Sequence, residues 1–182
     1  MTTFIALLRG INVGGHKLVK MAELKRTFEA LGFSRVQTYI QSGNVVFEAA
    51  EDEASLRRRI EQAIEAAFGF AVPTVLRTAQ ALEAIVADCP FPVDRLAEGE
   101  ELYVALLAEA PAQAGIDKLL ASRSDTDECR LAGREVYLLL RNGARETIFT
   151  NNFLEKKLGV PVTTRNWQTI NKLVEMGKEA RG

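Results

Sequence analysis

The sequence predicts an α+β fold: an internal duplication of two ferredoxin-like βαββαβ halves, each with an extra helix, packed together. The first observation is that residues 72–82 repeat as residues 160–170, at a spacing of 88. The second is that two earlier segments repeat in the same order, residues 4–8 as 103–107 and residues 43–47 as 133–137. Matches that keep one order along a chain are typical of duplicated structural units.

Hydrophobic periodicity predicts the elements of the first half in turn. Residues 4–8 are continuously apolar, as in a buried strand. A helix ending before Gly32 is indicated by apolar residues at helical spacing: Met21, Leu24, Phe28 and Leu31. Residues 35–40 and 44–48 predict a hairpin around Ser42 and Gly43.

A second helix is expected to end at Gly69, because helical spacing recurs before it: Leu56, Ile60, Ile64, Ala67 and Phe68. A strand at 73–77 and a helix at about 79–88 complete this half. The second half repeats the same order: strand 102–108, helix 112–122, hairpin 127–140, helix 151–158, strand 160–164 and helix 167–177. Pro90, Pro92 and Gly99 indicate a linker. We therefore expect domains at 1–89 and 101–182, joined by a linker at 90–100.

Four of the predicted strands lack polar alternation: 4–8, 104–108, 136–140 and, more briefly, 45–47. Such strands are typically covered on both faces. Helices cover one face, so we expect the other to pack against the sister half, a partner chain or an added element. An RNA-recognition motif needs an exposed sheet with stacking aromatic residues, and its RNP1 pattern is absent from residues 44–48.

Composition narrows the classes of function. The 182 residues carry a formal charge of −1, which argues against bulk electrostatic binding to nucleic acid. No apolar run approaches the roughly 18–20 residues that span a bilayer, and no leader-like segment precedes the first strand. Cys89 and Cys129 lack a CxxC or histidine partner, as expected of reduced thiols. We expect a cytoplasmic protein with no membrane, metal or cofactor.

A glycine-rich loop distinguishes the two halves. By the matches above, the first half carries nine more residues than the second between its first strand and its hairpin. Additions to one copy alone are more typical of function than of architecture. In the ferredoxin-like order 4-1-3-2, the loop after strand one and the turn before strand three lie at the same end of the sheet. The loop at 9–17 is therefore expected to adjoin the turn at 41–44.

The loop and the turn together predict a site for a small anionic or nucleotide-like ligand. Cations, amides, a hydroxyl and glycine N–H groups suit phosphate or carboxylate. The candidate ligand-binding residues are Arg9, Asn12, Gly14, Gly15, Lys17, Gln41, Ser42 and Asn44. The loop matches neither the GxxxxGK[ST] nor the GxGxxG motif, and a purely conformational role for Gly14 and Gly15 is the alternative.

Catalytic residues are not identified by the sequence. His16 is the only histidine, and a dyad with Ser42 would lack a third orienting group. The favoured interpretation of His16 is an exposed loop residue.

A possible second site is formed by Arg165, Asn166 and Trp167. Arg77 and Thr78 stand at the matching positions of the first copy, which favours architectural roles for Arg165 and Asn166, the latter as a helix N-cap. Trp167 has no such counterpart and is expected to fill the interface between the halves.

Several motifs occur in a specific order: LRGINVGG at 8–15, MAEL at 21–24, LGF at 31–33, TYIQSGNV at 38–45 and TRNW at 164–167. Together they resemble the bacterial domain-of-unknown-function family numbered 1697. The resemblance covers nearly the whole chain, with Lys20 standing where that family has proline. It implies an α+β protein of two related halves and brings no activity, cofactor or partner with it.

We therefore expect ligand binding at the loop and the turn, with enzymatic activity undecided. A reaction would use Arg9 and backbone amides to stabilise developing negative charge. Two alternatives stay open: a nucleic-acid-binding accessory protein that uses the basic strip from Arg9 to Arg35, and a protein-interaction module without catalysis. The oligomeric state is open as well.

Overall fold

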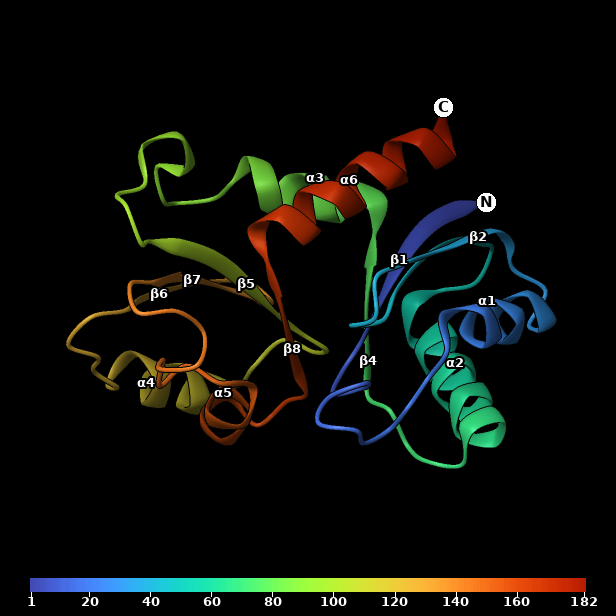
Figure 1. Ribbon diagram of the computed structural model, residues 1–182, viewed down its shortest axis with the longest axis horizontal. Coiled ribbons are helices and arrows are strands. Elements are labelled where there is room, and N and C mark those ends of the chain that lie inside the picture. Colours follow the sequence, from blue (N-terminus) through green and yellow to red (C-terminus); the bar gives the residue numbers. More distant parts are fainter. The chain divides into compact units, whose positions relative to one another are not determined.

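The computed structural model describes all 182 residues, which form two four-stranded antiparallel sheets and six α-helices (Figure 1). The chain divides into two compact units. Unit 1 contains Met1–Glu83 and Lys172–Gly182, and unit 2 contains Ala84–Asn171. The predicted fold class, a duplicated ferredoxin-like arrangement, is confirmed.

Unit 1 has the sheet order β2-β3-β1-β4, which is the ferredoxin-like order predicted from the sequence. Figure 1 shows helices α1 and α2 on one face of this sheet. The elements are β1 (Thr2–Leu8), α1 (Met21–Ala30), β2 (Ser34–Tyr39), β3 (Asn44–Ala49), α2 (Glu53–Phe68), β4 (Thr74–Thr78) and the start of α3 (Ala79–Ala87).

The C-terminal part of α6 (Trp167–Arg181) also belongs to unit 1. It packs closely there, because a Cβ atom added at Gly177 would lie 3.0 Å from the Ala79 Cβ and 3.8 Å from the Ile5 Cδ1. Ile5 points away from α1 and α2, since its neighbours Phe4 and Ala6 face those helices. The end of α6 therefore covers part of the second face of the unit 1 sheet.

Unit 2 repeats the plan with the order β6-β7-β5-β8. Helices α4 and α5 lie on one face of its sheet (Figure 1), and the backbone at Gly115 comes so close to Leu158 that a side chain would not fit. The elements are the 3-10 helix η1 (Val93–Arg95), β5 (Glu101–Leu107), α4 (Gln113–Leu120), β6 (Glu128–Ala132), β7 (Glu135–Leu140), α5 (Asn151–Leu158) and β8 (Val162–Asn166).

Strand pairing gives the correspondence between the two halves. Phe4 pairs with Thr78 as Tyr103 pairs with Asn166, so β1 matches β5 and β4 matches β8, as predicted. The predicted match of Gly43 with Gly133 is wrong by one residue, because the Leu8 N–H donates to the Gly43 carbonyl whereas the Leu107 N–H donates to the Arg134 carbonyl. The surplus between first strand and hairpin is therefore eight residues, not nine.

The four apolar strands are buried on both faces, as their lack of alternation predicted. The core of unit 1 is aromatic. The Phe47 ring lies 4.8 Å from Phe33, 5.2 Å from Phe28 and 5.8 Å from Phe4, measured between ring centroids. These rings lie against the helices and not on an open sheet face, so unit 1 lacks the stacking surface of an RNA-recognition motif.

Candidate functional site

The connection between β1 and α1 is much longer than the equivalent connection of unit 2. It runs over twelve residues, 9–20, whereas the β5–α4 connection has five, 108–112. The loop folds into a small hairpin in which Val13 and His16 form a bridge around Gly14 and Gly15. Both glycines have positive φ, +58° and +78°, as the two central residues of a tight hairpin turn require.

The structure brings the loop and the β2–β3 turn together. The Asn12 side-chain amide donates to the Gln41 carbonyl at 2.8 Å, and the buried Ile11 packs on Gly43. Gly43 has φ of +89°, and a Cβ atom there would lie 2.6 Å from the Ile11 Cδ1. Glycine at this position therefore allows the loop to seat against the turn.

Two predicted ligand-binding residues have their amides occupied by the backbone. The Asn12 Nδ2 also donates to the Val19 carbonyl at 3.0 Å, and its Oδ1 accepts from the Val19 N–H at 2.9 Å. Asn44 is fully buried, and its amide donates to the Tyr39 carbonyl and the Ser42 hydroxyl. Both asparagines therefore hold the backbone of the loop and the turn.

The other predicted residues are more accessible. Arg9 is half-buried, and its N–H donates to the Pro73 carbonyl at 2.9 Å. Lys17 is exposed and its Nζ donates to the Ala71 carbonyl at 3.0 Å, which ties the loop to the segment before β4. Gln41 is exposed, and the N–H groups of Gly14 and Gly15 make no backbone hydrogen bond.

Charge in this neighbourhood is of one sign. Residues 9–22 contain Arg9, Lys17 and Lys20 and no aspartate or glutamate, and residues 36–47 also lack acidic side chains. Like charges without interspersed carboxylates create a positive local potential. His16 is exposed in the hairpin, as expected from the sequence.

Backbone strain is concentrated at the same place. Four non-glycine residues have positive φ, and three of them, Asn12, Lys17 and Ile40, belong to the loop and the turn. Ile40 has φ of +48° and is β-branched, which makes this conformation costly. The sequence carried no signal for it, since isoleucine is the kind of residue least expected there.

The second predicted site is built into the framework of unit 2. Arg165 is buried, its guanidinium donates to the Thr163 hydroxyl at 2.7 Å, and burial lowers its pKa to about 10. Arg77 is buried at the equivalent position. The Asn166 side chain accepts from the Thr169 N–H at 2.8 Å, so its predicted N-cap role is observed, and Trp167 is half-buried.

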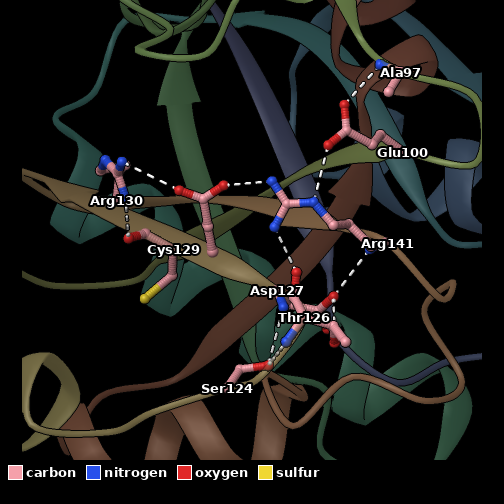
Figure 2. A network of polar contacts seen from close by, with 9 residues as sticks. Ala97, Glu100, Ser124, Thr126, Asp127, Cys129, Arg130 and Arg141 are labelled. Carbon is pink, nitrogen blue, oxygen red and sulfur yellow. Dashed lines mark hydrogen bonds and ion pairs between the residues drawn. The ribbon is translucent and has the colours of Figure 1, made fainter.

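A polar network centred on Arg141 was missed by the sequence patterns. Figure 2 shows its guanidinium between Glu100 and Thr126, and the backbone N–H of Arg141 donates to the Asp127 carboxylate at 2.9 Å. The guanidinium also bonds Glu128 at 2.6 Å. The partners lie 13 to 41 residues away, a separation at which no motif is readable.

Thiol chemistry and metal binding would depend on the cysteines and the acidic side chains. Burial raises the pKa of the Cys89 and Cys129 thiols, which disfavours the reactive thiolate. No group of three histidine, cysteine, aspartate or glutamate side chains is placed to hold a metal ion. None of the helices has the length and apolar character that crossing a bilayer requires.

The model of one family, described as a protein of unknown function (DUF1697), matches residues 1–137. Among solved structures, a conserved bacterial protein from Streptococcus pneumoniae superposes with a TM-score of 0.76 and 23% identity, covering 97% of this chain and 98% of that one. An unknown protein from Galdieria sulphuraria aligns over 91% of this chain and 98% of its own, at 12% identity and a TM-score of 0.27. No curated protein matches the sequence. The first likeness supports the fold, and the second supports no inference.

Proposed function

This chain belongs to the DUF1697 family of proteins of unknown function, and we propose that it binds a small anionic ligand at the loop 9–17 and the turn 41–44. The observation that carries the proposal is the strain at Asn12, Lys17 and Ile40. Strained backbone persists where the surrounding structure enforces it, and it is concentrated at binding and catalytic sites. Two of these residues, Asn12 and Lys17, lie in the connection that is seven residues longer than its counterpart in the second half.

The chemistry of the accessible groups suits an anion. The Arg9 guanidinium provides a charge with a planar set of donors, and Gly14 and Gly15 are exposed residues with no side chain to block approach to their N–H groups. Gln41 adds an amide. Asn12 and Asn44 hold the backbone of the loop and the turn in place. We assign them no direct ligand contact, because their amides already bind the backbone.

The proposal is tested by thermal-shift titration with inorganic phosphate, ATP and citrate. A ligand present at about 100 times its dissociation constant adds roughly 2.7 kcal/mol of stability to the protein. Arg9→Ala is expected to abolish the shift. Arg26→Ala removes the same charge from the exposed face of α1 and is the matched control, expected to keep the shift. A shift that survives Arg9→Ala, or no shift with any probe, contradicts the proposal.

A protein partner is the second candidate, favoured by exposed apolar side chains beside the same cations. Val13 and Leu18 are each 66% exposed, and Ile40 is 46% exposed. Leu18→Ser is expected to leave an anion response unchanged but to abolish self-association or partner capture, measured by sedimentation and pull-down. Salt-dependent binding of oligonucleotides with no response to the small anions would instead favour the nucleic-acid alternative.

A further inference from the structure

We propose a second ligand site in unit 2, unrelated to the loop site: a pocket of about 270 Å³ that takes a small, neutral, mostly apolar molecule with a carbonyl oxygen. The pocket lies over the sheet where the β7–α5 loop crosses it. Its apolar lining is Tyr103, Leu138, Leu140, Ala144 and Phe149, and its polar lining is Thr147, Thr150, Asn151 and Thr164.

The equivalent place in unit 1 is filled by side chains. Strand pairing matches Tyr103 with Phe4, Leu138 with Phe47 and Thr164 with Leu76. Phe4, Phe47 and Leu76 are at most 4% exposed and belong to the aromatic core. In unit 2 the smaller Leu138 therefore stands in place of the Phe47 ring, and Thr164, with its hydroxyl, stands in place of Leu76.

At one position the side chain of unit 2 is the larger one: Leu140 stands where unit 1 has Ala49, and it fills part of the volume that the smaller residues leave. The pocket nevertheless persists beside it. Leu138, Leu140 and Phe149 are at most 4% exposed and form the base of the pocket, whereas Ala144 and Thr150 are exposed, so the pocket is a recess in the surface of unit 2.

The segment that closes the pocket is an addition to unit 2. The β7–α5 connection has ten residues, 141–150, whereas the β3–α2 connection has three, 50–52. The Arg141 network of Figure 2 anchors its first residue to Asp127, Glu128 and Glu100. Two residues later, a Cβ atom at Gly143 would lie 3.6 Å from Glu101. The loop is therefore held in place, as a binding wall must be.

The polar groups of the pocket are mainly donors. The Thr164 hydroxyl donates to the Asn151 Oδ1 at 2.7 Å, which leaves the Asn151 Nδ2 to donate elsewhere. The hydroxyl oxygens of Thr147 and Thr150 accept the N–H groups of Phe149 and Phe153, so their hydrogens are available. Donors around an apolar space select a ligand oxygen that accepts.

Charge and size limit the ligand further. No lysine, arginine, aspartate or glutamate lines the pocket, so a neutral carbonyl is favoured over an anion. A cavity of about 150 Å³ is known to hold benzene, so about 270 Å³ leaves room for an aromatic ring with an amide. The ring of Tyr103 provides a flat apolar wall, while its hydroxyl donates to Glu101.

Benzamide, with toluene as its apolar counterpart, is the probe for an NMR titration of backbone amides. We expect saturable shifts confined to residues 141–151 and to β7, with benzamide binding at least tenfold more tightly than toluene. Asn151→Asp keeps the acceptor for Thr164 but loses the donor, and it should remove the preference for benzamide while leaving toluene binding unchanged. Equal affinities for the two probes, or shifts elsewhere, overturn the proposal.

Restoring the residues of unit 1 gives the decisive variants. Leu138→Phe and Thr164→Leu should each abolish benzamide binding, because the larger side chains occupy the base of the pocket, and melting temperatures check that both variants stay folded. If one of the two variants fails to fold, the other still tests the proposal. Leu131→Phe makes the same exchange outside the pocket and should bind normally. Unchanged binding in either filled variant overturns the proposal.

Discussion

The two halves share one strand order and differ in where they keep extra chain. Unit 1 lengthens the connection after β1, and unit 2 lengthens the connection after β7, each by seven residues relative to its counterpart. Because β7 runs antiparallel to β5, the two additions occupy opposite ends of equivalent sheets. The side chains under the helices differ as well: unit 1 has a cluster of aromatic rings, whereas unit 2 has leucines at the base of a surface pocket beneath the added loop.

This difference teaches that a duplicated fold offers two independent places to vary. The strands and the helix caps stay fixed, since changing them affects every neighbour. Connections at either end of the sheet change at lower cost, because surface loops tolerate insertions. Each half thus carries its own candidate site on a common framework.

The comparison is tested most severely in the cores. Phe47→Ala removes a ring that contacts three others and should lower the free energy of unfolding by about 3–5 kcal/mol. Leu138→Ala, at the equivalent position, should cost about 2–3 kcal/mol, because its side chain already borders a pocket. Urea denaturation measures both. Equal losses would mean that the core of unit 2 is packed as tightly as that of unit 1.

The turns differ next. Gly43→Ala places a Cβ atom against Ile11 at a positive φ and should cost about 2–3 kcal/mol. Arg134→Ala alters the equivalent residue, which does not have a positive φ, and should cost less than about 1 kcal/mol. The same denaturation experiment compares them. A mild Gly43→Ala would show that the loop is not seated on the turn.

The caps should behave alike. The Thr78 hydroxyl accepts from the Ala81 N–H at 3.0 Å, and the Asn166 side chain accepts from the Thr169 N–H at 2.8 Å. Replacing either residue with alanine should cost about 1 kcal/mol. Melting temperatures of the two variants provide the check, and a difference of more than twofold in cost would break the equivalence of the helices that follow β4 and β8.

The smallest effects concern pH. The Ser55 N–H lowers the pKa of Asp52 in unit 1, and the Ala97 N–H, with Arg141, lowers the pKa of Glu100 in unit 2. A carboxyl whose pKa falls on folding stabilises the protein above its unfolded pKa of about 4, and this contribution is lost as pH falls through the lower folded value. Asp52→Asn and Glu100→Gln should each flatten the fall in melting temperature between about pH 5 and pH 2. An unchanged slope would show that the carboxylate makes no pH-dependent contribution.

The sequence predicted the elements well where apolar spacing and punctuation agreed, as in α5, whose bounds match the expected 151–158. It misplaced the hairpin register because Gly43 and Gly133 look alike but differ in position: Gly43 is the last of four connecting residues, 40–43, and Gly133 is the first of two, 133–134. A one-residue slip exchanges the faces of a strand, which only the hydrogen bonds reveal. The division at 89 and 101 stays a prediction.

The contact between the loop and the turn was foreseen, whereas the backbone-holding roles of Asn12 and Asn44 were not, and ligand binding there stays a prediction. Strand order alone was enough to place the loop beside the turn. The asparagine side chain can bond a ligand or the backbone equally well, so only the hydrogen bonds of Asn12 and Asn44 in the folded protein distinguish the two uses. Nothing in the sequence indicated the pocket in unit 2. The pocket depends on smaller residues at positions where unit 1 has larger ones, and this difference is visible only once the two halves are aligned.

The division of α6 has a consequence for biosynthesis. Unit 1 needs Lys172–Gly182, which are translated only after the whole of unit 2. Until then, Ile5 and Ala79 lack the helix that packs on them at Gly177. The half that is made first is therefore finished last, and a nascent chain halted before residue 172 should expose this apolar patch to chaperones while unit 2 is already complete.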